Sequence, residues 1–126
     1  METILLSINP EYVAGILNET KKFEFRKRLA DKSVDRILIY ATLPTKQVVG
    51  EVQVLDTISA SPSALWDMTK KKAGISRKKF REYFKGCKTA YAYCLGNVIK
   101  YASPKELSEF NINQPPQSFI YIMDKK

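Results

Sequence analysis

The sequence contains no histidine among its 126 residues and only two cysteines, Cys87 and Cys94. The absence of histidine excludes the Ser–His and Cys–His nucleophile pairs and the usual imidazole general base. Two cysteines are too few for a disulfide framework or for a zinc site that has no histidine to complete it. Any chemistry must therefore come from lysine, carboxylates, tyrosine, hydroxyls or a thiol, and we expect neither a metal nor a cofactor.

Long apolar runs are also missing from the sequence. No stretch approaches the roughly 18 apolar residues that a membrane-spanning helix needs. The N-terminus has no basic region followed by an apolar signal core, so we expect a cytoplasmic protein without membrane contact. With 44% apolar and 27% charged residues the composition is that of a globular protein, and the length predicts a single domain over residues 1–126.

Positive charge is concentrated in one segment. Residues 70–88 hold nine basic residues and one acidic residue, Glu82, and this excess equals the formal net charge of +8 for the whole chain. A concentrated basic patch is typical of nucleic-acid binding, although a solvated helix face has the same composition. The residues of this segment that we predict to contact a nucleic acid are Arg77, Lys78, Lys79 and Arg81.

Two-residue periodicity dominates the chain. It predicts strands over 3–8, 23–27, 36–42, 47–58, 89–95, 98–101 and 118–123, with a bulge or bend at Gly50 and a hairpin turn at Gly96–Asn97. Cap residues followed by proline or a helical pattern predict helices over 10–18, 62–72, 76–86 and 103–110. Strands and helices do not alternate regularly, which favours an α+β fold with a mixed, mainly antiparallel sheet curled into a small barrel with inserted helices.

The segment after the first predicted helix carries the candidate site. Lys21 lies at the turn from helix to strand, and Glu24 and Arg26 are two residues apart, so both project from the same strand face. In a cleft, the two cations would favour a phosphate or carbonyl oxygen, and Glu24 would hold the guanidinium in place. A lysine close to another cation also loses part of its preference for the charged form, as a base or nucleophile requires. An outer sheet face with ordinary ion pairs would show the same alternation.

The pattern Lys21-x-x-Glu24-x-Arg26 resembles the signature of ASCH domains, whose fold is similar to that of PUA domains. Further short segments resemble the same family in order and spacing: 6–12, 39–44, 49–51, 65–66, 83–86, 90–92 and 115–119. The resemblance implies a PUA-like β-barrel with a cleft lined by the signature residues and a function in RNA binding. Some small members are amidohydrolases of N4-acetylcytidine that use a lysine matching Lys21, and ribonuclease activity is also associated with the family.

Two departures from the family pattern bear on these expectations. The family often has glycine where this chain has Glu19, and Asn18 is then the residue expected to adopt the left-handed conformation. The amidohydrolase members carry threonine where this chain has Glu24, so their hydroxyl is missing here. Lys21 and Arg26 are the residues that carry over without change.

Other residues are weaker candidates. Tyr40 could stack on a base, and Gln117 and Ser118 in a rigid proline-containing loop could hydrogen-bond a base edge. Glu51 follows a strand glycine and could serve as an acid or base or be solvated. Trp66 lies beside apolar residues on a predicted helix, and we interpret it as a core residue.

These observations support three classes of function. The first is binding of RNA or a modified nucleoside or nucleotide in a basic cleft that contains Lys21, Glu24 and Arg26. The second is an enzyme, an amidohydrolase or ribonuclease, in which Lys21 is the base or nucleophile and Glu24 or Glu51 moves protons. The third is a protein-interaction module, because the fold alone does not determine function.

Overall fold

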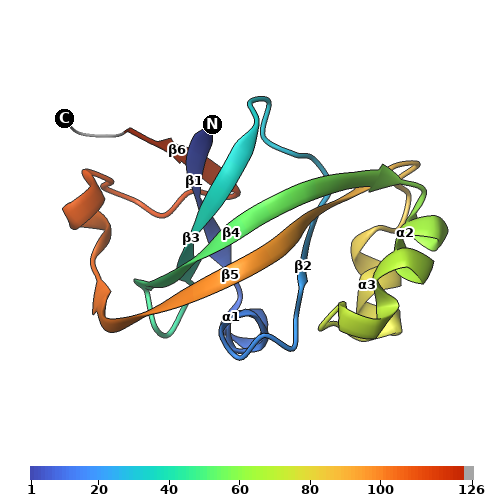
Figure 1. Cartoon of the computed structure of the whole chain (residues 1–126), viewed down its shortest axis with the longest axis horizontal. Helices are drawn as coiled ribbons and strands as arrows, with labels where there is room; N and C mark the ends of the chain where they lie inside the picture. Colours follow the sequence, from blue (N-terminus) through green and yellow to red (C-terminus); the bar gives the residue numbers. More distant parts are fainter. Residues whose placement is uncertain (124–126) are drawn as a thin grey trace.

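The computed structural model describes residues 1–123, which form one six-stranded sheet with helices at one face and at one end (Figure 1). Among residues 1–123, none of the helices has the length and apolar composition of a membrane span. The elements in chain order are β1 (Glu2–Ile8), α1 (Pro10–Leu17), β2 (Phe23–Arg26), β3 (Val34–Ala41), β4 (Gln47–Ala60), α2 (Pro62–Thr69), the 3-10 helix η1 (Lys70–Lys72), α3 (Arg77–Tyr83), β5 (Ala90–Lys105), the 3-10 helix η2 (Leu107–Phe110) and β6 (Phe119–Ile122).

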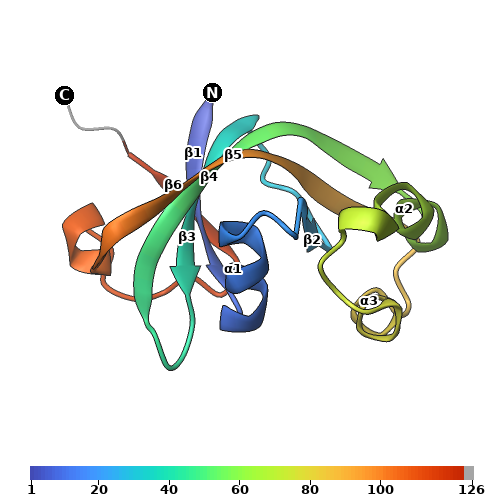
Figure 2. The same cartoon turned by 60° about the horizontal axis from the view of Figure 1, so that its bottom comes forward.

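The sheet is mixed and open. Its strand order is β2-β5-β4-β3-β1-β6, in which β1 and β3 run parallel and the other neighbours are antiparallel. The α+β class and the mixed sheet are confirmed, but the predicted closure into a barrel is wrong because β2 and β6 lie at opposite edges. The long β4–β5 ribbon extends away from β1, β3 and β6, pairs with β2 along its far half and carries α2 and α3 at its end (Figure 1, Figure 2). Helix α1 covers one face of the sheet.

Helix starts follow from local side-chain hydrogen bonds, as predicted. The Asn9 side chain accepts a hydrogen bond from the Glu11 amide at 2.9 Å, and Pro10 occupies the first turn of α1. Ser61 caps α2 and Ser76 caps α3 in the same way. These caps satisfy amide groups that have no partner inside a helix, so they determine where each helix begins.

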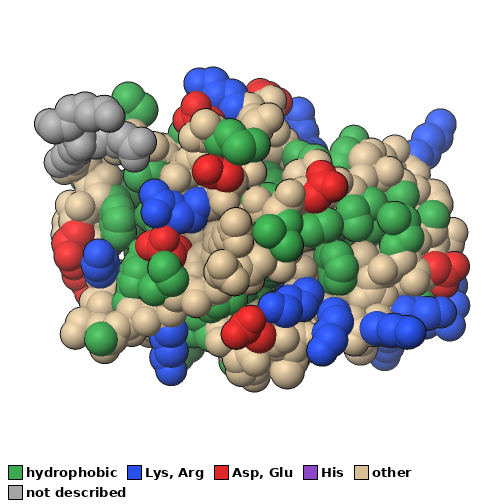
Figure 3. All heavy atoms as spheres, in the orientation of Figure 1, with side chains coloured by type: hydrophobic (Ala, Val, Ile, Leu, Met, Phe, Trp, Pro, Cys, Tyr) green, Lys and Arg blue, Asp and Glu red, His purple; other side chains and the backbone are tan. Residues whose placement is uncertain are grey.

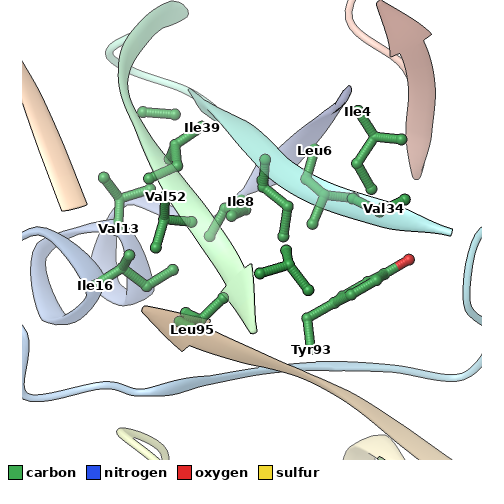
Figure 4. Close-up of a cluster of buried hydrophobic side chains, with 13 residues drawn as sticks. Ile4, Leu6, Ile8, Val13, Ile16, Val34, Ile39, Val52, Tyr93 and Leu95 are labelled. Carbon is green, nitrogen blue, oxygen red and sulfur yellow. The ribbon is translucent and has the colours of Figure 1, made fainter. Parts of the chain in front are cut away.

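The core divides into clusters of buried side chains, of which two lie on the faces of the sheet and one lies between the sheet and the helices α2 and α3. The first cluster packs α1 against β1, β3, β4 and β5, and its side chains interdigitate without polar atoms apart from the Tyr93 hydroxyl (Figure 4). A second cluster is aromatic and places Phe25 of β2 against Phe80 and Phe84, at ring-centroid distances of 5.0 and 6.3 Å. This cluster fixes α3 against β2, the strand that carries Glu24 and Arg26.

The expected hairpin turn at Gly96–Asn97 is wrong, because β5 continues through it from Ala90 to Lys105. A Cβ at Gly96 would lie 2.6 Å from Oε1 of Gln53, so glycine here allows close approach to β4 rather than a turn. The predicted helix over 103–110 is reduced to η2. The bulge expected at Gly50 is confirmed by a register shift between β4 and β5 at this residue.

Candidate functional site

A pocket of about 180 Å³ lies where the end of β1, the start of α1, β2 and the segment before α3 meet. All three signature residues line it. Its lining consists of Ser7, Ile8, Asn9, Tyr12, Lys21, Glu24, Phe25, Arg26, Ile75 and Tyr83. The structure therefore brings Lys21, Glu24 and Arg26 to one concave site, as the sequence predicted. We call this site the signature pocket.

Lys21 is held in the signature pocket by hydrogen bonds to two separate segments of the chain. Its amide donates to the Gly15 carbonyl oxygen at 2.9 Å, and the next amide, of Lys22, donates to the carbonyl oxygen of Lys72 at 2.9 Å. The Lys21 side chain is only 3% exposed, and its Nζ donates to the carbonyl oxygen of Ala73 at 2.7 Å. The ammonium group is thus placed by α1 on one side and by the segment that follows η1 on the other.

Burial lowers the pKa of Lys21 from 10.5 to about 8, because the low-dielectric surroundings disfavour the charged form. The Glu24 carboxylate opposes this effect, and the Arg26 guanidinium adds to it. Nζ also lies 5.2 Å from the ring centre of Tyr12 and 4.8 Å from that of Phe25, where the faces of the rings stabilise a cation. Near neutral pH, Lys21 can therefore act as a cation and also supply a fraction of neutral amine.

Glu24 and Arg26 form a tight pair at the wall of the pocket. One carboxylate oxygen of Glu24 accepts from Nε of Arg26 at 3.1 Å and from a terminal nitrogen at 2.7 Å. That terminal nitrogen also donates to the Ser7 carbonyl oxygen at 3.0 Å. Guanidinium has five N–H donors, and within residues 1–123 the second terminal nitrogen has no protein acceptor, so its two donors remain for a ligand.

Two tyrosines that the sequence analysis did not select complete the pocket. Tyr12 extends from the first turns of α1, and Tyr83, at the end of α3, is 37% exposed. Burial raises the pKa of both hydroxyl groups, so they stay protonated and can donate a hydrogen bond at neutral pH. Tyr83 comes close to Arg26 only through the packing of α3 against β2, so its role in the site follows from the fold and not from a local sequence pattern.

The loop residues Gln117 and Ser118 lie beside the pocket rather than in its lining. Both are exposed. The loop is attached to the site through Ser7, whose hydroxyl donates to the Pro116 carbonyl oxygen at 2.7 Å and whose amide donates to that of Ser118 at 3.3 Å. The loop backbone is thus held next to Ser7, which lines the pocket, and a contact of Gln117 or Ser118 with a ligand stays a prediction.

Tyr40 is a correction to the predicted site. It is 3% exposed and packs with Leu5, Leu38 and Val48 in a separate core cluster, away from the residues that line the signature pocket. The ring therefore has no free face on which a base could stack. Glu51 is also absent from the pocket lining; its carboxylate accepts from Arg36 and Tyr101 on another part of the sheet.

The turn before Lys21 differs in detail from expectation. Glu19, not Asn18, is left-handed, with φ of 66°, while Asn18 has φ of −91°. The side chain of Asn18 instead accepts hydrogen bonds from the amide and hydroxyl of Thr20 at 3.0 and 2.6 Å. The position that is often glycine in the family is thus the one that requires a positive φ here.

The predicted basic residues of α3 lie on different sides of the helix. Lys79 approaches the start of α1, where its Nζ lies 3.3 Å from a carboxylate oxygen of Glu11. Arg77 and Arg81 face α2, and Lys78 is exposed elsewhere on the helix. Cationic side chains gather along this end of the molecule (Figure 3). Within residues 1–123 no group of histidine, cysteine and carboxylate side chains is placed to hold a metal ion.

The open mixed sheet with α1 on one face and a lysine–glutamate–arginine pocket at its edge defines a PUA-like α+β protein. Residues 6–109 match the family model described as ASCH domain, and the chain belongs to this family. The resemblance of the sequence to ASCH domains is thereby confirmed.

The chain is similar to proteins of quite different length. It is 34% identical over 122 residues to an ATP synthase subunit alpha and to a large ribosomal subunit protein uL22, both of Ureaplasma parvum serovar 3. Both matches include 96% of this chain, but the chain spans only 15% of the length of the first protein and 39% of the length of the second. It is also 32% identical over 122 residues to an ASCH domain-containing ribonuclease of Zymomonas mobilis, covering 94% of this chain and 82% of that protein.

Solved structures agree with the fold. A crystal structure of ASCH from Zymomonas mobilis has a TM-score of 0.89 and 29% identity, covering 97% of this chain and 88% of that chain. A mutant form of the same protein also has a TM-score of 0.89, with 28% identity and coverage of 98% and 91%. The arrangement of strands and helices is therefore that of ASCH structures.

Proposed function

We propose that the signature pocket binds a nucleotide unit of RNA, or a modified nucleoside of similar size. The observation that carries this proposal is the Arg26 guanidinium, which Glu24 and Ser7 hold in place while two of its donors remain unused within residues 1–123. Such a fixed, partly desolvated guanidinium suits a phosphate or carbonyl oxygen. The relative named an ASCH domain-containing ribonuclease supports RNA as the ligand class.

The surroundings of Arg26 support a ligand with both an anionic and an aromatic part. Lys21 supplies a second cation, and Tyr12 and Tyr83 supply ring faces and hydroxyl donors at the pocket wall. Aromatic faces and cations together are the usual means of holding a single-stranded nucleotide. The exposed Gln117 and Ser118 would contact neighbouring parts of the strand.

A second candidate function is cleavage of the bound ligand, which the lowered pKa of Lys21 favours. For RNA, the neutral amine would accept the proton of a 2′-hydroxyl, and O2′ would attack the adjacent phosphorus. The bond from phosphorus to O5′ would break, leaving a 2′,3′-cyclic phosphate and a 5′-hydroxyl that takes its proton from water. For N4-acetylcytidine, the same amine would accept a proton from the water that attacks the acetyl carbonyl. The bond from the acetyl carbon to N4 would then break, and N4 would take the proton from the Lys21 ammonium, giving acetate and cytidine.

Mass spectrometry after incubation with N4-acetylcytidine and, separately, with total RNA tests both candidates. The matched variants are Lys21→Met and Lys22→Met, because Lys22 is a neighbour whose ammonium pairs with Glu19 outside the pocket. Cyclic-phosphate fragments or free acetate that disappear only in Lys21→Met would establish the enzyme. If no product forms, equilibrium binding of RNA that weakens at least tenfold in Arg26→Gln would establish the binding function alone. Unchanged binding in Arg26→Gln would contradict the proposal.

A further inference from the structure

A second concave site lies on the opposite side of α3 from the signature pocket. It has a volume of about 380 Å³, within the range of roughly 300 to 1,000 Å³ that is typical of small-molecule sites. We call it the α2–α3 groove. It is lined by Pro62, Ser63, Trp66, Asp67, Arg77, Phe80, Arg81, Phe84 and Lys85.

The floor of the groove is aromatic and one ring of it is accessible. Trp66 is only half-buried and packs against Phe80 at a ring-centroid distance of 5.1 Å, while Phe80 in turn contacts Phe84 at 4.8 Å. Both phenylalanines are fully buried. The interpretation of Trp66 as a core residue is therefore only half correct: one side of the indole supports the core, and the rest of it lines the groove.

The rim of the groove is cationic. Arg77 and Arg81 are one helical turn apart on α3, and Lys85 follows just beyond the helix. No carboxylate within residues 1–123 forms an ion pair with any of these three side chains, and the one acidic lining residue, Asp67, lies 3.8 Å from the ammonium of Lys70. The groove thus combines an aromatic face with unpaired positive charge.

The direction of α3 links the groove to the signature pocket. Lys79 and Tyr83 follow Arg77 and Arg81 by two residues each, so they project from the other side of the helix. Tyr83 lines the signature pocket, and Lys79 reaches Glu11 on α1. The helix is therefore a shared wall with a site on either side.

We propose that the α2–α3 groove binds a nucleotide of single-stranded RNA, with the base stacked on Trp66 and its phosphates contacted by Arg77, Arg81 and Lys85. A π face beside guanidinium groups is what an unstacked base and its phosphate require. The positive charge of the rim attracts an acidic ligand and disfavours a basic partner. This inference deepens the proposed function, on which it rests for the choice of RNA, by adding a second contact along the same strand.

The experiment uses the fluorescence of Trp66, which is the only tryptophan in the chain. We expect a single-stranded oligouridylate of about ten nucleotides to quench this emission in a saturable manner, because a stacked base removes excited-state energy. An abasic oligonucleotide of equal length keeps the phosphates and should bind without quenching. Oligouridylate that binds without quenching Trp66 would overturn the inference, as would oligouridylate that does not bind.

Variants assign the contact to the groove. The double substitution Arg77→Glu and Arg81→Glu should weaken oligouridylate binding at least tenfold and reduce the salt dependence by about 0.7 per cation removed. The matched double substitution Lys71→Glu and Lys88→Glu places the same charge change on exposed residues outside the groove and should cost only a fewfold. Equal losses in the two double variants would overturn the inference, because they would indicate non-specific attraction.

Failure of the groove and failure of the signature pocket give different results. If Arg26→Gln weakens binding but the groove variants do not, the proposed function stands and the groove inference is wrong. If quenching of Trp66 and the effect of the groove variants persist while Arg26→Gln changes nothing, the groove binds RNA and the signature pocket does not. Trp66→Leu keeps an apolar side chain over Phe80, so weaker oligouridylate binding in this variant would assign the lost affinity to the indole.

Discussion

Gly74 packs directly against Lys21. Its backbone is left-handed, with φ of +66°, and a Cβ at this position would overlap the Cβ and Cγ of Lys21 and lie 3.0 Å from its Cα. The neighbouring carbonyl, of Ala73, accepts the hydrogen bond from the Lys21 ammonium. The segment between η1 and α3 therefore determines the position of the lysine as much as the turn from α1 to β2 does.

Gly74→Ala should destabilise the protein by about 2 kcal/mol or more and weaken ligand binding or turnover. Part of the cost is the strain of a positive φ in alanine, roughly 1 to 2 kcal/mol, and the rest is displacement of Lys21. Gly86→Ala is the matched control, because Gly86 also has a positive φ, of +82°, but its added Cβ meets no atom within 4 Å. Urea unfolding and RNA binding measure the two effects. Equal losses of function in both variants would contradict the direct role of Gly74.

The pKa of Lys21 makes stability depend on pH. The fold lowers this pKa from 10.5 to about 8, so between these values the unfolded chain binds one more proton and stability rises with pH. Below about pH 8 the folded state bears the full cost of burying the cation. Lys21→Met removes that cost, so its stability relative to the native protein should be greater at about pH 7 than at about pH 9.5, by about 2 kcal/mol.

Urea unfolding at the two pH values measures this difference. Lys22→Met controls for loss of an ammonium group that lies outside the signature pocket and pairs with Glu19. A difference between Lys21→Met and the native protein that does not change with pH would show that Lys21 titrates as an ordinary surface lysine.

Much of this architecture could be predicted where the cause is local. Asn9, Ser61 and Ser76 cap their helices because a side-chain oxygen reaches an amide two or three residues away, which sequence spacing reveals. Glu24 and Arg26 share a face because strand side chains alternate. These relationships depend on neighbouring residues and need no knowledge of the rest of the fold.

Features that depend on distant pairing could not be predicted. The sequence predicted a strand that contains Tyr40, but not that Leu5, Val48 and Ile112 would pack against its side chain. Closure of the sheet required β2 and β6 to meet, and nothing in either four-residue strand specifies its edge partner. The site role of Tyr83 likewise arises only because the aromatic cluster seats α3 against β2.

Glu24→Gln should lower the pKa of Lys21 below about 8, because the carboxylate is the group that favours the protonated amine. The substitution also leaves Arg26, with a side chain only 14% exposed, without its anionic partner, and we expect a loss of about 3 kcal/mol in stability. NMR titration of the Lys21 side chain measures the first effect and urea unfolding the second. Glu19→Gln, which removes an exposed carboxylate paired with Lys22, is the control. An unchanged or raised Lys21 pKa in Glu24→Gln would contradict the conclusion that the Glu24 carboxylate stabilises the Lys21 ammonium.

The pH dependence of function should distinguish the two roles proposed for Lys21. A ligand-binding cation acts while it is protonated, so the affinity for RNA should fall as the pH rises through about 8. A general base acts while it is neutral, so the rate constant for cleavage at saturating RNA should instead rise through the same value and then level off.

Binding and single-turnover cleavage are therefore measured at constant ionic strength from about pH 6.5 to about pH 9, in the native protein and in Lys21→Met. The variant provides the baseline, because any pH dependence that it retains comes from other groups or from the RNA. Affinity that falls only in the native protein assigns Lys21 to phosphate binding, and a cleavage rate that rises only in the native protein assigns it to proton transfer. Profiles that coincide in the two proteins would exclude both roles and leave Arg26 as the residue of the signature pocket that engages RNA.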